Sequence, residues 1–339
     1  MKLLTIAVPC YNSAAYMEKC VQSLLPGGFE VEILIVDDGS QKDDTAKIAD
    51  RLEYENPGIV KAIHQPNAGH GGAVSTGIQY ATGLYFKVVD SDDCLDEKAY
   101  KEILDVLREM RDSGSPVDMV LSNFIYDKEG QKHKKVMQYK RVLPVDRVFT
   151  WQEIGYFLPG KYILMHSVIY RTRILQKMNF KLPKHTFYVD NIYAFTPFQN
   201  VKTLYYKDVN LYKYYIGRED QSVNESIMIS RIDQQLKVNR IMIDDYTKIR
   251  FRSRKLAQYM RSYLAIITVI SSVLAIRSGS EENLKKKDEI WAYMKEKNPK
   301  LYRQIRYGIV GLAVNLPGKY GRKIVSKGYE LAQKIYGFN

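Results

Sequence analysis

The chain has 339 residues, which is enough for one large domain or two modest ones with a sizeable hydrophobic core. Its composition, 45% hydrophobic and 26% charged, excludes a disordered or fibrous protein. Its three cysteines, Cys10, Cys20 and Cys94, form no CxxC pair and match no metal motif, so we expect buried reduced thiols rather than disulfides or a zinc site.

The net charge of +13 is concentrated at one end of the chain. Residues 248–339 carry 20 Lys/Arg and 6 Asp/Glu, whereas residues 1–247 carry 31 and 32. A basic segment on a near-neutral body favours an anionic partner such as a membrane surface. We expect no nucleic-acid partner, because the chain has no recognisable nucleic-acid-binding motif. The alternatives are a helical segment packed on one face and solvated on the other, or a contact in a homo-oligomer.

The N-terminal apolar run predicts a buried strand rather than an export signal. Lys2 is followed by six residues that are mostly apolar, and Pro9 interrupts them. A secretory signal has a longer apolar region and a small-residue cleavage site after it. We therefore expect the protein to stay in the cytoplasm.

Residues 1–120 alternate between short apolar runs and amphipathic stretches. The apolar runs predict strands at 3–8, 32–36, 60–64, 85–89 and 119–122, and the amphipathic stretches predict helices at 14–25, 43–54, 71–81 and 99–110. Strands that are apolar along their length and alternate with helices indicate an α/β fold with a mostly parallel sheet. In such sheets, ligands bind beyond the carboxyl ends of the strands.

The rest of the chain has a different pattern. Residues 123–185 are less regular and fit an insertion or an acceptor-facing segment more than a separate domain. Tyr-rich strand-like stretches at 204–206 and 211–215 precede a helix predicted at 230–244. Residues 248–339 read as a mainly helical basic extension. Within it, the uncharged run 262–276 would span about 22 Å as a helix, short of the roughly 30 Å membrane core, so it predicts a buried or interfacial helix.

Three carboxylates, Asp90, Asp92 and Asp93, follow the strand predicted at 85–89. A divalent cation would relieve their mutual repulsion, and Mg²⁺ or Mn²⁺ prefers carboxylate and phosphate oxygens. A metal held by Asp92 would stabilise the charge that develops on a leaving diphosphate, while Asp90 contacts the donor's ribose or shares the metal. Asp93 is expected to be structural. The alternative for all three is a solvated acidic turn that caps the next helix.

Other predicted loops carry groups that suit a nucleotide. Asp38 can accept hydrogen bonds from a ribose hydroxyl or a uracil N–H, and Tyr11 could stack on a base while backbone groups around Pro9 bond its edge. The glycines around His70 allow backbone to approach a phosphate at a helix N-terminus, in neither the Walker nor the GxGxxG register. His70 contacts the phosphate or sugar, or is an ordinary loop histidine.

Together these segments resemble the family 2 glycosyltransferases, which have the GT-A fold. The resemblance covers residues 3–120, in the family's order and spacing. The matching segments are Pro9-Cys10-Tyr11-Asn12, Val36-Asp37-Asp38-Gly39-Ser40, Asn67-Ala68-Gly69 and Val89-Asp90-Ser91-Asp92-Asp93. The resemblance implies a metal, Mn²⁺ or Mg²⁺, at Asp92. With the neighbouring loop residues added, the donor contacts are Pro9, Tyr11, Asn12, Asp38, Asn67, Gly69, His70 and Asp90.

The resemblance extends to two later positions and has two departures. Asp190 matches the family's catalytic base, although Val189 stands where many members have Glu. Arg218 follows the Tyr-rich stretch and matches an arginine that reaches the diphosphate. Val74 replaces an arginine that many members carry, so His70 or Arg218 would supply the phosphate contact. The synthases' Gln-x-x-Arg-Trp motif is absent, which argues against a polymerising enzyme.

The resulting expectation is an inverting glycosyltransferase of bacterial polysaccharide or glycolipid type, which uses a UDP-sugar and a glycan or lipid-linked acceptor at the inner face of the membrane. Residues 1–247 would form the GT-A domain, with donor binding in 1–120 and the acceptor and catalytic part in 121–247. Residues 248–339 would be the helical extension. A sugar nucleotidyltransferase is an alternative, but this chain lacks the Gly-rich basic loop that such enzymes carry after the first strand. A non-catalytic nucleotide-sugar-binding protein of the same fold is a further alternative.

Overall fold

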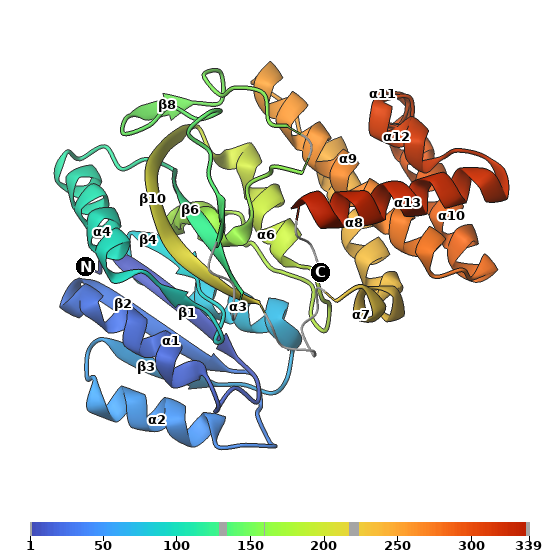
Figure 1. The fold of residues 1–339 in the computed structure, drawn as a ribbon. Coiled ribbons are helices and arrows are strands. Elements are labelled where there is room, and N and C mark those ends of the chain that lie inside the picture. Colours follow the sequence, from blue (N-terminus) through green and yellow to red (C-terminus); the bar gives the residue numbers. More distant parts are fainter. Residues whose placement is uncertain (1, 129–133, 159, 217–223, 337–339) are drawn as a thin grey trace. The chain divides into compact units, whose positions relative to one another are not determined.

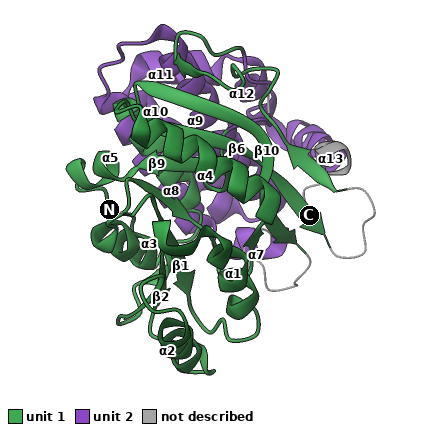
Figure 2. Cartoon of the chain, turned by 90° about the vertical axis from the view of Figure 1, so that its left-hand side faces the viewer, with its two compact units in different colours: residues 1–155, 163–217 green, residues 156–162, 218–339 purple. Residues whose placement is uncertain are grey.

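The computed structural model describes residues 2–128, 134–158, 160–216 and 224–336, with side chains as far as residue 331. It forms two compact units (Figure 2): residues 1–155 with 163–217, which we term the sheet unit, and residues 156–162 with 218–339, the helical unit. The predicted boundary between residues 247 and 248 falls inside the helical unit, because the helix that ends at Lys248 packs on the helices after it.

The sheet unit contains one sheet, with ten strands among the described residues (Figure 1). The order is β3-β2-β1-β4-β9-β6-β10-β5, with β7 beside β6 and β8 beside β10. The long pairings β1–β2, β1–β4, β2–β3 and β6–β10 are parallel, so the expected mostly parallel α/β sheet is confirmed. The strands are β1 Leu4–Cys10, β2 Val31–Asp37, β3 Val60–His64, β4 Tyr85–Val88, β5 Cys94–Leu95, β6 Met119–Lys128, β7 Lys135–Met137, β8 Val148–Thr150, β9 Val168–Arg171 and β10 Thr203–Ile216.

The segment expected to be irregular supplies three of these strands. Between residues 123 and 185 the chain forms β7, β8 and β9, each only three or four residues long and each antiparallel to its neighbours. β9 lies between β4 and β6 and so joins the two parallel parts of the sheet. Strands this short carry too little period-two alternation to be recognised in a sequence.

Helices cover the sheet and are held to it by apolar faces. The amphipathic helix α4 buries Tyr100, Ile103 and Leu107, and its N-cap Asp96 accepts the Ala99 N–H over 3.1 Å. α3 packs on β1 and β2. The helices of this unit are α1 Met17–Leu24, η1 Leu25–Glu30, α2 Thr45–Glu55, α3 Gly69–Tyr80, α4 Glu97–Asp112, η2 Met165–Ser167, α5 Thr172–Lys177, α6 Asp190–Phe195 and η3 Thr196–Asn200.

The helical unit confirms the expected helical C-terminal region. Its helices are α7 Glu225–Ser230, α8 Ile232–Lys248, α9 Arg254–Arg277, α10 Glu281–Lys297, α11 Pro299–Arg306, α12 Ile309–Val314 and α13 Gly318–Tyr336. The predicted apolar run lies inside α9, which begins eight residues before it. By length and composition α9 could cross a membrane, the one such helix among the described residues, but 67% of its apolar window is buried within the structure.

Polar pairs explain why α9 carries Ser and Thr on a buried face. Gln235 of α8 donates to Ser271 Oγ over 3.3 Å, and Asn239 donates to Thr268 Oγ1 over 3.0 Å. The Trp291 indole of α10 donates to Ser272 Oγ, another buried serine of α9, over 3.1 Å. These bonds satisfy groups that would be costly to bury alone, and they place α9 in the interior of the helical unit.

The cysteines lie in the sheet unit as free thiols. Cys10 and Cys20 are buried and Cys94 is half-buried. Burial raises the pKa of all three thiols, so they remain protonated at neutral pH.

Candidate active site

The carboxyl ends of β1, β2 and β4 lie at one edge of the sheet. The register places the last residue of β1 beside the last residue of β2, and β4 runs parallel on the other side of β1. The loops that follow therefore meet: Ser13 Oγ lies 3.0 Å from Ser91 Oγ, and the Asn12 N–H donates to Ser40 Oγ over 2.9 Å. The site residues that the sequence predicts between positions 9 and 92 lie at this edge. Ligands of parallel sheets bind at such an edge.

The loop after β1 contains one side chain that is open for stacking. Tyr11 is 51% exposed. Asn12 has a φ of +49° and accepts the N–H groups of Gln41 and Lys42 through Oδ1, at 3.3 and 3.1 Å. Asn12 thus joins two loops, while Pro9 is buried within β1. A base could stack on the Tyr11 ring, and Asn12 would act by fixing the loop.

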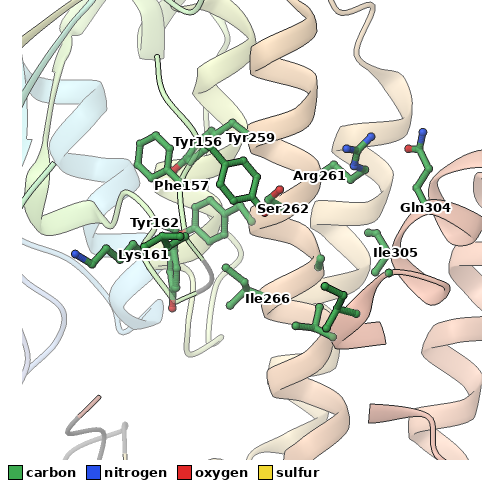
Figure 3. A pocket seen from close by; sticks show the side chains of 16 residues that line it. Tyr156, Phe157, Lys161, Tyr162, Tyr259, Arg261, Ser262, Ile266, Gln304 and Ile305 are labelled. Carbon is green, nitrogen blue, oxygen red and sulfur yellow. The ribbon is translucent and has the colours of Figure 1, made fainter. Parts of the chain in front are cut away.

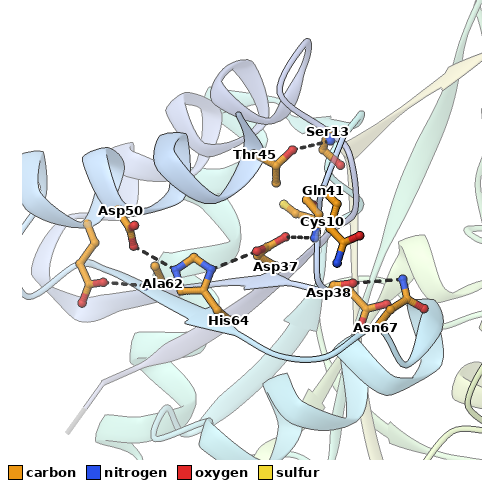
Figure 4. A network of polar contacts seen from close by, with 12 residues as sticks. Cys10, Ser13, Asp37, Asp38, Gln41, Thr45, Asp50, Ala62, His64 and Asn67 are labelled. Atoms are coloured by element: carbon orange, nitrogen blue, oxygen red, sulfur yellow. Dashed lines mark hydrogen bonds and ion pairs between the residues drawn. The ribbon is translucent and has the colours of Figure 1, made fainter. Parts of the chain in front are cut away.

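Asp38 shapes the glycine-containing turn before α3. Its carboxylate is 2% exposed and accepts hydrogen bonds from the N–H groups of Ala68 (2.9 Å) and Gly69 (2.7 Å) and from Gln65 Nε2 (2.6 Å). The Asn67 side chain donates to the Asp38 backbone carbonyl over 3.1 Å (Figure 4). Asp38 therefore positions the Asn67 turn directly, and contact with a donor remains a prediction.

A second network, also drawn in Figure 4, fixes the end of β2. His64 Nδ1 lies 3.0 Å from Asp37 Oδ2, and its Nε2 lies 2.9 Å from Asp50. Bonds to Asp37 and then Asp50 raise the pKa of His64. Asp37 also accepts the Ser40 N–H over 3.1 Å. This histidine has no motif around it, so sequence analysis did not find its role.

His70, Asp90 and Asp190 form an electrostatic group. His70 Nε2 lies 2.8 Å from Asp90 Oδ1. Burial disfavours the charged ring, but the Asp90 carboxylate outweighs it and the pKa of His70 is raised. Burial also opposes the charged form of Asp90, yet His70 holds the pKa of Asp90 below its usual range. Burial raises the pKa of Asp190 to about 6, against a smaller lowering by His70.

Asp93 anchors the acidic loop to β10. Its oxygens accept the Tyr212 hydroxyl over 2.5 Å and the Tyr215 N–H over 2.8 Å. The same Tyr212 hydroxyl accepts the Asp90 N–H over 3.1 Å. Burial, followed by repulsion from Asp92 and Asp90, raises the pKa of Asp93 well above its usual range. A buried carboxyl whose oxygens both have protein partners acts as a structural group.

The structure adds His166 and Lys87 to the surroundings of Asp90. The His166 ring stacks between Tyr212 and Tyr214, with centroids 4.7 and 4.6 Å away, and its buried Nδ1 has no hydrogen-bond partner. Burial lowers the pKa of His166 to about 4. Lys87 Nζ donates to the His166 carbonyl over 2.7 Å, and burial lowers its pKa to about 7. In the sequence, Lys87 is detectable as a lysine within an apolar strand. No pattern in the sequence points to His166.

Among the described residues, one group of side chains is close enough to share a metal ion: Asp90, Asp93 and His166, whose candidate ligand atoms lie within 4.8 Å of one another. The unpartnered His166 nitrogen and the carboxylate of Asp90 suit a divalent cation. Asp92, the predicted ligand, is half-buried beside this group. The donor set therefore fits a metal at this loop.

Asp190 is the first residue of α6, and Val189 before it is 1% exposed. A glutamate at Val189 would be a buried carboxylate, whereas valine packs in the core. Tyr188 has a φ of +64°, so the chain turns sharply before Asp190. Arg218, the predicted diphosphate contact, lies outside the described residues.

Comparison with known proteins gives consistent results. The family described as "Glycosyl transferase family 2" matches residues 5–173. The chain is 32% identical over 125 residues to the glycosyltransferase GlyG of Streptococcus pneumoniae, covering 36% of this chain and 39% of GlyG. It is 25% identical over 269 residues to the uncharacterised glycosyltransferase YibD of Escherichia coli, covering 77% and 72%. The chain thus spans well under half of GlyG.

The fold is similar to that of S. aureus TarS residues 1–349 in complex with UDP-GlcNAc. The TM-score is 0.69 at 18% identity, and the superposition covers 98% of this chain and 92% of that one. At this identity the likeness shows the fold, which includes the helical C-terminal part.

Proposed function

This chain belongs to glycosyltransferase family 2 and is a glycosyltransferase of the GT-A fold, and we propose that it transfers a sugar from a UDP-sugar to a hydroxyl of a glycan or lipid-linked acceptor with inversion at the anomeric carbon. The observation that carries the proposal is the placement of Asp190, with its pKa near 6, in the electrostatic surroundings of His70 and Asp90. A carboxyl tuned toward neutral pH suits a general base.

The donor's nucleoside would bind at the edge formed by the β1 and β2 loops. The exposed Tyr11 ring offers a stacking face, and the buried Asp38 holds Asn67 and Gly69 in the turn at the start of α3. His70, beside Asp90, would contact the phosphates or the sugar. Arg218 is proposed from the sequence alone. The solved complex of TarS with UDP-GlcNAc supports uridine as the nucleoside.

Mn²⁺ or Mg²⁺ would bind at Asp92, with Asp90 as the second carboxylate. Asp93 is the weaker ligand, because both of its oxygens accept hydrogen bonds from β10. His166 supplies a neutral nitrogen, since burial lowers its pKa to about 4. When bound, the metal supplies positive charge that stabilises the leaving diphosphate.

Other residues of the chain would transfer the proton and hold the loops around the donor. Asp190 accepts the proton of the acceptor hydroxyl, whose oxygen attacks the anomeric carbon from the face opposite the nucleotide. The Asp93–Tyr212 bond holds the acidic loop in place. Asn12 and Asp38 fix the two loops that frame the nucleoside, so the donor binds to a preformed edge.

We place the enzyme in the cytoplasm, at the inner face of the cell membrane, in the synthesis of a cell-surface polysaccharide or glycoconjugate. The basic C-terminal region supports this location, because cations near a cytoplasmic leaflet are attracted by its anionic lipids. A second copy of the chain is the other partner that this region would suit.

A thermal-shift screen of UDP-sugars with and without Mn²⁺ tests donor and metal together. We expect one or more UDP-sugars to raise the melting temperature only when Mn²⁺ is present, and Asp92→Ala to abolish that rise. Asp105→Ala, which removes an exposed carboxylate of α4, is the matched control and should keep it. Metal-independent stabilisation that persists in Asp92→Ala would refute the metal assignment. Pyrophosphate release from a nucleoside triphosphate and a sugar phosphate would instead indicate a nucleotidyltransferase.

A further inference from the structure

Large apolar side chains are exposed together on the last two helices of the helical unit. On α12, Ile309 is 89% exposed and Leu312 is 49% exposed; on α13, Tyr320, Ile324 and Leu331 are 84%, 61% and 60% exposed. Isolated exposed apolar residues are ordinary, whereas five on two successive helices suggest an interaction surface.

The exposed apolar side chains of α13 form a stripe with cations beside it. At about 100° per residue, Tyr320, Ile324 and Leu331 fall within a sector of about 40° on the helix. Three exposed lysines lie to one side of the stripe, within about 100° of it: Lys319, Lys323 and Lys327. This arrangement is typical of helices that lie in the plane of a membrane interface.

The charge of this segment is almost entirely positive. Residues 299–331 contain seven Lys/Arg and one acidic residue, Glu330. Glu330 forms an ion pair with Arg277 over 3.1 Å. Within the described part of the chain, no carboxylate forms an ion pair with Lys319, Lys323 or Lys327. The surface is therefore complementary to an anionic partner.

Two other parts of the helical unit are used internally. Lys286 pairs with Asp233 and Glu282 at 2.8 and 2.9 Å, and the buried Lys287 donates to Asn315 Oδ1 over 2.8 Å. Most of the apolar window of α9 is buried. These contacts distinguish the exposed side chains of α12 and α13 from Lys286, Lys287 and α9.

A cavity of about 280 Å³ adjoins α12 within the same unit (Figure 3). It is lined by α9, by residues 156–162, and by the end of α11 with the start of α12, so that Ile309 belongs both to the cavity and to the exposed face. Its lining is mainly aromatic and aliphatic, with two cations, Lys161 and Arg261. The volume is just below the roughly 300–1,000 Å³ of small-molecule sites, and it suits part of a hydrocarbon chain beside an anionic group.

We propose that α12, α13 and this cavity form a docking surface for a bilayer that contains anionic lipid. The lysines of α13 attract the headgroups, the exposed apolar side chains enter the interface, and the cavity accepts part of an acyl chain. This surface specifies the membrane location proposed above and rests on it. It does not involve the chemistry at Asp190, so its test stands apart from that of glycosyl transfer.

Flotation of the full chain with vesicles tests the surface. We expect binding to vesicles of phosphatidylcholine and phosphatidylglycerol in equal parts, and little binding to phosphatidylcholine alone. The double variant Lys319→Gln with Lys323→Gln should weaken binding roughly 30-fold, since each cation near the surface contributes about a factor of five. The control double variant, Lys98→Gln with Lys285→Gln, removes two exposed lysines elsewhere and should bind as the wild type does.

The apolar contribution to vesicle binding is tested with a second pair of matched substitutions. Ile309→Ser removes an 89% exposed side chain from α12, and Tyr54→Ser removes an 87% exposed side chain from the sheet unit. We expect weaker binding, by about ten-fold, only for Ile309→Ser. Equal binding to both vesicle types, or equal loss in the test and control variants, overturns the proposal. Circular-dichroism melting of every variant establishes that the folds are intact.

Occupation of the cavity is tested by fluorescence quenching. A tryptophan placed by Tyr156→Trp lies in the cavity lining, and Tyr54→Trp serves as the control in the sheet unit. With phosphatidylglycerol brominated on the acyl chain, the Tyr156→Trp signal should fall and the Tyr54→Trp signal should not. The two native tryptophans form a constant background in both variants. Equal quenching in the two variants rules out an acyl chain in the cavity.

Discussion

At the scale of single residues, the surroundings of Asp190 set the pKa of its carboxyl group. Burial raises its pKa to about 6, and the surrounding charges act in opposite directions: His70 lowers that pKa and Asp90 raises it. A base must be unprotonated to accept a proton, so the active form is present above the pKa and is lost as pH falls through it.

The rate of sugar transfer should therefore depend on pH in a defined way. We expect log kcat/KM to rise with pH below about 6 and to level above it, as measured with saturating metal and a fixed UDP-sugar. An Asp190→Glu variant, if active, should move the inflection. An inflection that stays at the same pH in that variant would assign it to another group.

Asp190→Asn should remove the base while preserving the donor site. We expect kcat to fall by roughly 10²–10⁴-fold, with the donor-induced rise in melting temperature unchanged. Asp105→Ala, which removes an exposed carboxylate of α4, is the control and should keep the wild-type kcat. An Asp190→Asn variant with wild-type kcat would show that the base lies elsewhere.

The sequence indicates where the acidic side chains of this site lie along the chain, but not which groups they contact. Asp90, Asp92 and Asp93 were placed at a strand end because a strand with apolar residues at nearly every position is easy to recognise. That Asp38 bonds to Ala68, Gly69 and Gln65 could not be foreseen, since its partners lie about 30 residues away. His166 was missed for the same reason, because only the fold brings it beside Asp90.

At the scale of elements, β10 supports the acidic loop. It pairs with β6 along most of its length, and with β8 near its start and β5 near its end. Through Tyr212 and Tyr215 it holds both Asp90 and Asp93. The loop is thus fixed by a long interior strand rather than by its own two ends.

Tyr212→Phe tests that support. The substitution leaves a buried carboxyl group, Asp93, without one of its two partners, which should lower the free energy of unfolding by about 1–3 kcal/mol. Tyr214→Phe, two positions along the same strand, is the matched control, because no hydrogen bond of its hydroxyl is recorded among the described residues. Denaturant unfolding measures both. An equal loss in the control would refute the role of the Tyr212 hydroxyl.

Two helical glycines should respond in opposite directions to alanine. A Cβ on Gly77 of α3 would lie 2.5 Å from the Ala7 side chain of β1, whereas a Cβ on Gly328 of α13 would meet nothing within 4 Å. We expect Gly77→Ala to destabilise by about 1–3 kcal/mol. Gly328→Ala should stabilise by up to about 1 kcal/mol through helix propensity. Thermal unfolding of the two variants distinguishes packing from propensity.

Some helices and strands were predicted from the sequence and others were missed, for a physical reason. The strand at 60–64 was predicted with its observed bounds, and α9 was predicted short because its first turns carry charges that face outward. β7, β8 and β9 were not predicted. They are antiparallel strands of three or four residues, and their pairing is set by tertiary contacts rather than by local pattern.

At the scale of the whole molecule, the excess positive charge lies in one of the two compact units. The excess of 14 positive charges in residues 248–339 lies in the helical unit, while the remainder of the chain is nearly neutral. Electrostatic attraction to an anionic surface would therefore act on one unit, while the proposed donor site lies in the other.

This division predicts different salt responses. Vesicle binding should weaken steeply as salt is raised from about 0.1 M to about 1 M, because the Debye length shrinks from about 10 Å to about 3 Å. Donor-induced stabilisation should change far less, since its proposed charged groups are partly buried. Flotation and thermal shift in the same buffers compare the two. A vesicle affinity that does not change with salt would leave only apolar insertion as its cause.

The protonated cysteines have a practical consequence. Because the thiols of Cys10, Cys20 and Cys94 are at least half-buried and their pKa values are raised, thiol-reactive dyes should modify them slowly in the folded chain. A cysteine introduced on the surface would then react first, without removal of the native ones. An environment-sensitive dye at position 309 could follow membrane contact in real time, with the same dye at position 54 as the reference.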